Sequence, residues 1–394
     1  MKGLRRFMLA RYGAYSFLAL EVLLLPLLVP PRVYGDIEYF RYVAGLAPTL
    51  FLGSHTGYMY VLYTQGRDNY PALLHGGLLV LAVGTAILAT AMNVGYLAPA
   101  VLVAGIAVVL EKRMQSGKQF YLAILYRPLV AVVLLAAAGV WTARGFQLYG
   151  AALVNVGYCG ALLIWCLAMV RFCTLSLKEV FLPVGSRRFL SDYGRLIQAG
   201  FVENLATVFL GLFLFADRQL LRSAGSAALP VFSLAFNLAQ FAVIGVNSIG
   251  YVSAVADGEG FSTLEAAHVR RGLSRAFAVC AFLGFATVLV ALVYDRMVMH
   301  NDGLVMATAL VLLGSGIYFS VGTASAIILY GNLQWRSTAA TGIAAALNWG
   351  LSSWMIASGF PWVLLVAKTA VLLIALAAFN FALIFSVLRS NRVA

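Results

Sequence analysis

The 394-residue sequence is 62% hydrophobic, carries only 10% charged residues and has a formal net charge of +13. A soluble domain could not cover this much apolar surface with so few polar side chains, so the composition excludes a soluble protein and predicts one that lies in lipid. Mainly apolar runs recur from end to end, and each approaches the roughly 20 residues that an α-helix needs to cross a bilayer.

The apolar runs predict an all-α polytopic membrane protein with about twelve transmembrane helices and no sizeable soluble domain. The first run is too long for the core of a signal peptide and lacks a small-residue cleavage pattern, so we expect it to remain as a helix. The spans are expected near residues 12–31, 42–63, 72–92, 94–110, 120–141, 148–170, 196–216, 228–255, 272–294, 303–329, 338–358 and 361–388.

Lys and Arg residues are distributed unevenly between the loops that join these spans. If the amino terminus is cytoplasmic, most of the 27 Lys and Arg residues fall in cytoplasmic segments, as the positive-inside rule requires. We therefore expect both termini in the cytoplasm. Because the positive charge is explained as an orientation signal, nucleic acid is not expected as a partner.

The longest connection between spans is the basic stretch 171–195, which has six spans before it and six after it. This predicts an N-terminal lobe at 1–170, a basic cytoplasmic linker at 171–195 and a C-terminal lobe at 196–394. Duplicated halves are common in transporters, where the substrate path lies at the interface of the repeats. We expect two pseudo-symmetric six-helix lobes around a central cleft.

Polar side chains lie along one face of several spans, at the spacing of about 100° per residue that a helix imposes. The second span carries Tyr42 and Tyr63 on such a face, and the eighth carries Ser233. Hydrogen bonds between helices would explain each stripe without a cavity, whereas stripes on equivalent spans of both halves favour a cleft. The cleft candidates are Thr49, Thr56 and Tyr60 on the second span, Asn204 on the seventh, and Asn237, Gln240 and Asn247 on the eighth.

Four charged residues fall inside apolar spans, where a central charge costs about 2.5 to 3.5 kcal/mol. Arg127 and Lys368 lie near span ends and can snorkel to the headgroups. Glu203 is expected at a depth similar to that of Arg127, so a structural ion pair and a proton-coupling carboxylate are both open. Glu21 lies near mid-membrane with no charged neighbour on its helix, so it is the better candidate for a carboxylate that binds a proton or cation during transport.

The remaining polar residues predict structural roles. Asp217 and Arg218 at the outer end of the seventh span suggest a salt bridge at the rim, and His55 and His75 suggest core or interfacial positions. The four cysteines lie in or at the end of apolar spans and are expected as small buried hydrophobic residues. No catalytic or metal-binding motif is present in the sequence, so we expect neither an enzyme nor a metal or other cofactor.

Two stretches resemble a known family. The segment 193–260 has a helix that ends in Asp217-Arg218 with two apolar residues after it, then a small-residue turn and an F-S-L-A run at Phe232–Ala235. Near the amino terminus, the stretch Pro30–Gly35 precedes an aromatic-rich entry to the second span. Together they resemble Wzx-type O-antigen and exopolysaccharide flippases of the multidrug, oligosaccharidyl-lipid and polysaccharide exporter superfamily.

The resemblance implies a flippase of the bacterial cytoplasmic (inner) membrane that moves an undecaprenyl-linked sugar by alternating access, with polysaccharide polymerase or glycosyltransferases as possible partners. Arg127 and Lys368 would hold the phosphate, and Tyr, Asn and Gln side chains of the second and eighth spans would contact sugar hydroxyls. Two alternatives remain open. One is a multidrug or metabolite antiporter of the same superfamily, and the other is a membrane enzyme or assembly subunit of polysaccharide biosynthesis.

Overall fold

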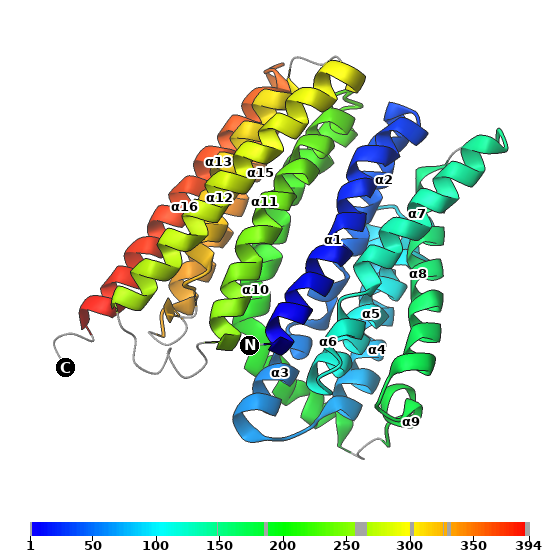
Figure 1. Ribbon diagram of the computed structural model, residues 1–394, viewed down its shortest axis with the longest axis vertical. Helices are drawn as coiled ribbons and strands as arrows, with labels where there is room; N and C mark the ends of the chain where they lie inside the picture. The colour runs from blue at the N-terminus through cyan, green and yellow to red at the C-terminus, as the bar shows by residue number, and fades with distance from the viewer. Residues whose placement is uncertain are drawn as a thin grey trace. The chain divides into compact units, whose positions relative to one another are not determined.

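The structure is a computed structural model that describes residues 2–147, 149–184, 188–256, 266–299, 303–325, 327–328 and 332–390. The described residues are almost entirely helical (Figure 1). The chain divides into two compact units, Met1–Val208 and Phe209–Ala394, and the division falls within helix α10. We call them unit 1 and unit 2.

Unit 1 contains the first part of α10 and every helix before it. Its elements are α1 (Lys2–Leu28), α2 (Pro31–Gly45), η1 (Ala47–Phe51), α3 (Ser54–Gln65), α4 (Tyr70–Ala91), η2 (Gly95–Leu97), α5 (Ala98–Ser116), α6 (Phe120–Ala123), α7 (Tyr126–Ala143), α8 (Gly150–Phe172), α9 (Leu177–Phe181) and α10 (Phe189–Ser223). Within it α7 packs on α8 and on α1, α4 packs on α5, and α8 also contacts α2 and α5.

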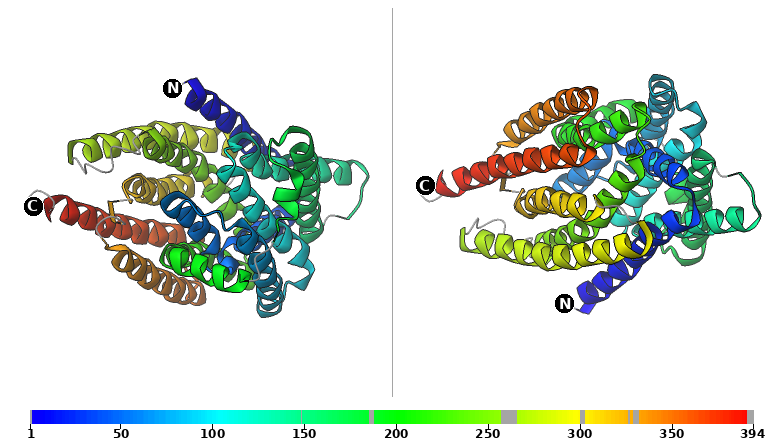
Figure 2. Two further views of the ribbon diagram at one scale, coloured as in Figure 1. Left: turned by 90° about the horizontal axis from the view of Figure 1, so that it is seen from below. Right: turned by 90° about the horizontal axis from the view of Figure 1, so that it is seen from above.

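Unit 2 is a bundle of long helices. After α10 it contains α11 (Leu229–Ala256), α12 (Ala266–Tyr294), η4 (Asp295–Met299), α13 (Leu304–Gly322), α15 (Gln334–Ala357) and α16 (Trp362–Ser390). Helix α13 packs on α11, α12 and α16, and α15 packs on α16. The end-on views show these helices as a bundle with a roughly common direction (Figure 2).

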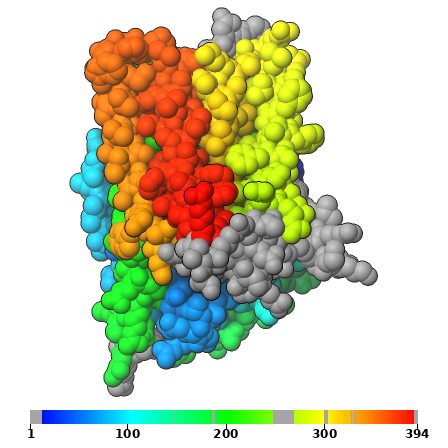
Figure 3. Space-filling model, turned by 90° about the vertical axis from the view of Figure 1, so that its left-hand side faces the viewer, coloured from blue at the N-terminus to red at the C-terminus, as the bar shows by residue number. Residues whose placement is uncertain are grey.

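The prediction of a polytopic helical membrane protein is confirmed. Among the described residues, nine helices are long and apolar enough to cross a membrane, and each predicted span coincides with a helix or a pair of helices. Many large side chains on the surface of unit 2 are apolar, for example Phe282 (74% exposed), Ile343 (63%) and Val371 (64%). Such a surface suits lipid tails. In Figure 3 the orange atoms of α15, the red atoms of α16 and the yellow to yellow-green atoms of α12 lie on this face.

The second predicted span is broken rather than continuous. Helix α2 ends at Gly45, a short 3-10 turn carries Pro48, and α3 begins at Ser54. Proline lacks an N–H and its ring clashes with the preceding helical turn, while Leu52 (φ 52°) and Gly53 (φ 89°) adopt left-handed conformations that end the helical path. The single polar face expected along 42–63 is therefore wrong, because it assumed one uninterrupted helix.

The break lies against the first part of α10 at glycine contacts within unit 1. A Cβ built on Gly57 would overlap the carbonyl oxygen of Leu196, and one built on Gly53 would lie 2.9 Å from Cβ of Asn204. The hydroxyl of Tyr193 also donates to Phe51 O at 3.4 Å. Small residues thus let α3 approach the α10 backbone closely, as is typical of helix pairs in membranes.

Replacing Gly57 by alanine should destabilise unit 1, because the added methyl group has no space beside the α10 backbone. We expect a loss of about 1–3 kcal/mol, the usual cost of overpacking. The measurement is the melting temperature of the full chain in detergent. Gly139→Ala is the matched control, because no atom lies within 4 Å of a Cβ at that position of α7. Equal melting temperatures for the two variants would contradict the close contact.

Candidate functional site

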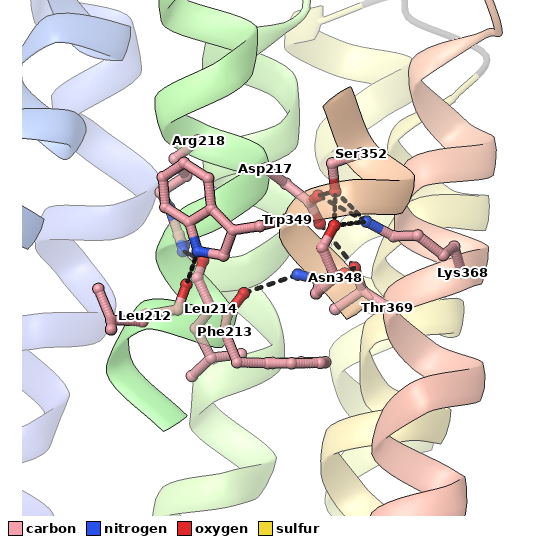
Figure 4. Close-up of polar contacts among 10 residues, drawn as sticks. All are labelled: Leu212, Phe213, Leu214, Asp217, Arg218, Asn348, Trp349, Ser352, Lys368 and Thr369. Carbon is pink, nitrogen blue, oxygen red and sulfur yellow. Dashed lines mark hydrogen bonds and ion pairs between the residues drawn. The ribbon is translucent and has the colours of Figure 1, made fainter. Parts of the chain in front are cut away.

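A polar cluster of unit 2 surrounds Asp217 on α10 (Figure 4). Its Oδ1 accepts hydrogen bonds from Lys368 Nζ at 2.8 Å and from Ser352 Oγ at 2.5 Å, and its Oδ2 accepts one from Thr369 Oγ1 at 2.6 Å. Only 1% of Asp217 is exposed. The carboxylate therefore has three donors and one full compensating charge, which is what a buried ion needs to be tolerated.

Two side chains of α15 fix that helix to the backbone of α10. Asn348 Nδ2 donates to Phe213 O at 2.7 Å, and Trp349 Nε1 donates to Leu212 O at 3.0 Å. Asn348 and Ser352 are four residues apart, so both point from the same face of α15. This register brings Ser352 to Asp217, and α16 adds Lys368 and Thr369 from the other side (Figure 4).

Two expectations for this region are wrong. Asp217 and Arg218 do not form a rim salt bridge, because successive residues on a helix point in different directions. Arg218 is only 6% exposed, donates to Leu214 O at 3.1 Å and lies over the rings of Phe236 and Phe232. Lys368 does not snorkel to the headgroups, because its side chain is 9% exposed and pairs with Asp217.

A second cluster of charges lies inside unit 1. Arg41 on α2 approaches Glu21 on α1 with its two terminal nitrogens, at 2.5 and 3.1 Å, and Glu38 at 3.1 Å. Glu21 is fully buried and Glu38 is 7% exposed. One guanidinium therefore faces two buried carboxylates, so the cluster has one excess negative charge whenever both carboxylates are ionised.

Sequence reasoning missed the partner of Glu21. Arg41 was expected in the loop between the first two spans, but Pro30 and Pro31 end α1 and start α2 at once. The chain therefore turns back early and brings Arg41 beside Glu21. The spacing of Glu38 and Arg41, three residues apart, was a usable signal, because such residues are neighbours on a helix.

The other two charges predicted inside the membrane, Arg127 and Glu203, do not pair with each other in the described part of unit 1. Both side chains are exposed. Arg127 interacts electrostatically with Tyr158, and Glu203 with Lys112 of α5. The expectation of a structural ion pair between Arg127 and Glu203 is therefore wrong for the described residues.

The predicted cleft residues lie in different settings. Asn204 is 5% exposed and packs against the helix break, whereas Tyr60 is 52% exposed on α3. The other predicted cleft residues have intermediate exposure, except for one whose side chain is not described. The intermediate residues are Thr49, Thr56, Asn237 and Gln240, and the side chain outside the description is Asn247.

The cysteines and histidines have no shared cluster among the described residues. All four cysteines are free, and Cys159 is exposed, so the expectation of burial is wrong for it. His75 is exposed and lies 3.3 Å from Pro183 O, which suits an interfacial position. His55 is half-buried beside Phe51.

Comparison with known proteins finds similar folds among solved structures. No protein-family model and no curated protein matches the sequence. A crystal structure of MATE in the straight conformation has a TM-score of 0.58 and 14% identity, and the match covers 100% of this chain and 97% of that chain. The chain has the fold of MATE transporters.

Two further similar structures are conformations of a multidrug resistance MATE family transporter of the MOP superfamily. The inward-facing structure has a TM-score of 0.58 and 15% identity, and the outward-facing structure has a TM-score of 0.56 and 14% identity. Each match covers 98% of this chain and 95% of the other. This likeness establishes the fold and the multi-pass membrane character of the chain.

Removing the ammonium from the unit 2 cluster should be strongly destabilising. Lys368→Ala leaves the buried carboxylate of Asp217 uncompensated, which costs about 3–5 kcal/mol, so the melting temperature in detergent should fall well below that of the native chain. The double variant Asp217→Ala/Lys368→Ala should recover much of this loss. Lys178→Ala, on an exposed residue, is the control. A single variant as stable as this control would show that the pair has no structural role.

Proposed function

We propose that the protein is a secondary exporter that works by alternating access. The observation that supports this is the fold, which is shared over nearly the whole chain with a transporter solved in inward-facing and outward-facing conformations. In such a mechanism two halves rearrange around a binding site, and a coupled ion supplies the free energy. The two compact units are compatible with this mechanism.

The coupled ion in this proposal is a proton bound by the Glu21–Glu38–Arg41 cluster. Two carboxylates that share one guanidinium in a water-poor interior cannot both stay ionised without a cost. Binding one proton removes the excess charge, and losing it restores the excess charge. Glu203, the second predicted coupling residue, is exposed and therefore lacks the burial that makes protonation at Glu21 consequential.

We propose two substrate classes and give the better supported one first. The first is a small amphipathic molecule, because the similar structures include a multidrug resistance transporter. The second is the lipid-linked oligosaccharide that the sequence resemblance suggests. A specific observation favours it, namely that Thr56, Tyr60 and Tyr63 follow one face of α3, where Tyr60 is 52% and Tyr63 69% exposed. Hydroxyls and aromatic faces are the groups that contact sugars.

The two substrate classes are separated by deleting the gene in a host that builds undecaprenyl-linked oligosaccharides. A flippase predicts that these lipids accumulate with their sugars on the cytoplasmic side. If the protein is a multidrug antiporter, deletion leaves these lipids unchanged. Everted vesicles that contain the protein then take up ethidium when a proton gradient is applied, and vesicles from the deletion strain do not. If deletion changes neither the position of the lipid-linked sugars nor the proton-driven uptake of ethidium, the exporter proposal is contradicted.

Glu21→Gln should abolish coupling and leave folding intact. The amide cannot exchange a proton, but it does remove the excess charge. We therefore expect gradient-driven transport to fall by about a hundredfold or more, as loss of a positioned proton-transfer group does. Everted vesicles report the rate, and the melting temperature reports folding. Glu179→Gln, on the exposed α9, is the matched control. A proton-driven rate equal to that of the control would rule Glu21 out.

A further inference from the structure

The segment that follows α8 is fixed to unit 1 along one side. Helix α9 begins with a capping box at Ser176. Val180 is fully buried in a core cluster with residues of α5 and α8, and its carbonyl oxygen accepts a hydrogen bond from the hydroxyl of Tyr70 at 2.7 Å. Further along, Pro183 O lies 3.3 Å from His75 Nε2 on α4. The backbone of this segment therefore has a defined orientation on unit 1.

The same segment exposes apolar side chains that do not pack on unit 1. Phe172 at the end of α8 is 66% exposed, and Leu182 and Val184 are 76% and 92% exposed. Leu177 and Phe181 lie one turn apart on α9 and are also exposed. Apolar side chains gathered in this way on a surface mark a contact with a partner or with a membrane.

These side chains continue the lipid-facing surface of α8. Leu163, Leu167 and Val170 are 63%, 60% and 60% exposed, and their spacing of four and three residues places them on one face of the helix. Helix α8 is a candidate membrane span that ends at Phe172, and α9 follows directly beyond this end (Figure 1). The exposed apolar side chains after Phe172 are therefore expected at the depth of the lipid headgroups, where aromatic residues gather in membrane proteins.

Three exposed cations accompany the apolar side chains. The guanidinium of Arg171 lies over the ring of the next residue at 5.5 Å, and Lys178 is exposed on α9. Lys118 is exposed in the turn after α5, where the neighbouring Gly117 packs so closely on Leu175 that a Cβ would lie 2.5 Å from its side chain. Within the described ranges none of the three cations has a carboxylate at ion-pair distance. Their charge is therefore available to an anionic partner.

We propose that residues 171–184 and Lys118 form a membrane anchor that binds anionic phospholipids of the bilayer. An amphipathic segment with Lys and Arg beside its apolar side chains lies in the membrane interface, where apolar burial and attraction to anionic headgroups add together. The long basic side chains reach the phosphates while their stems cover the lipid tails. Lipid is the occupant because the apolar surface is continuous with the lipid-facing side of α8. This contact is independent of the substrate that the protein moves.

Lipid preference tests the charged part of the anchor. The full chain purified in detergent is titrated with dioleoylphosphatidylglycerol and, separately, with zwitterionic dioleoylphosphatidylcholine, and bound lipid is counted by native mass spectrometry. We expect the anionic lipid to bind at least about tenfold more tightly, because each basic side chain near an anionic surface increases affinity about fivefold. Equal affinity for the two lipids would contradict the proposal.

A triple variant tests whether these three cations cause the preference. Affinity for phosphatidylglycerol should fall by about tenfold or more, and affinity for phosphatidylcholine should stay unchanged, in Lys118→Gln/Arg171→Gln/Lys178→Gln. The charge-matched control removes three exposed cations at the end of α7, on α12 and on α15, and should keep the preference; it is Arg144→Gln/Arg270→Gln/Arg336→Gln. In detergent without added lipid both variants should melt at the temperature of the native chain. Equal losses of affinity in the two variants would show attraction by net charge alone and would refute the site.

A nitroxide label at position 184 tests the apolar part. The label is attached to Val184→Cys in a full chain whose four native cysteines are replaced by alanine, and the chain is placed in nanodiscs that contain both phospholipids. We expect oxygen, which concentrates in hydrocarbon, to relax the label more than a water-soluble nickel chelate does, as it should for a label at the lipid-exposed Phe282→Cys. Preferential access of the nickel chelate would place the segment in water, and protection from both reagents would mean that protein covers it. Either result overturns the anchor.

Discussion

The cost of an uncompensated charge or an unpaired polar group in a water-poor interior governs this structure. Backbone groups in hydrocarbon must be satisfied internally, which is why nearly every described residue is helical. Side-chain charges follow the same rule and reach far along the chain for partners. Lys368 and Asp217 are 151 residues apart, and Arg41 and Glu21 are 20 apart. Each pair therefore joins helices and fixes how they pack.

The same constraint explains what happens where the helix breaks. Interrupting the second span frees backbone groups that water does not reach, and unit 1 meets this by pressing the break against α10. Gly53 and Gly57 allow the approach, and the hydroxyl of Tyr193 reaches Phe51 O. At the start of α3 the N–H groups of Thr56 and Gly57 donate to Gly53 O at 3.0 and 2.8 Å. The interruption itself follows from local sequence, with Pro48 in the 3-10 turn and Leu52 and Gly53 in left-handed conformations.

The sequence predicted the features of this fold that depend on local composition. Span positions and membrane character follow from hydropathy, since roughly 20 apolar residues form a helix in lipid whatever lies around them. Glu21 and Lys368 were recognised as costly for the same reason. Their partners were missed because pairing depends on distant chain segments and on where loops end. Arg41 was assigned to the loop between the first two spans, and Asp217 to a salt bridge at the rim. Each error came from treating the spans as uniform rods.

The two units solve the same electrostatic problem differently. In unit 2 the lysine and the aspartate balance each other, and two hydroxyls and an amide complete the set, so no exchange of protons or substrate is needed for neutrality. In unit 1 two carboxylates, Glu21 and Glu38, share one arginine, Arg41. The Asp217–Lys368 pair is neutral when both groups are charged, whereas two buried carboxylates that share one guanidinium cannot both be ionised without a cost. The charge imbalance therefore lies in the Glu21–Glu38–Arg41 cluster of unit 1, whereas the Asp217–Lys368 pair of unit 2 is neutral.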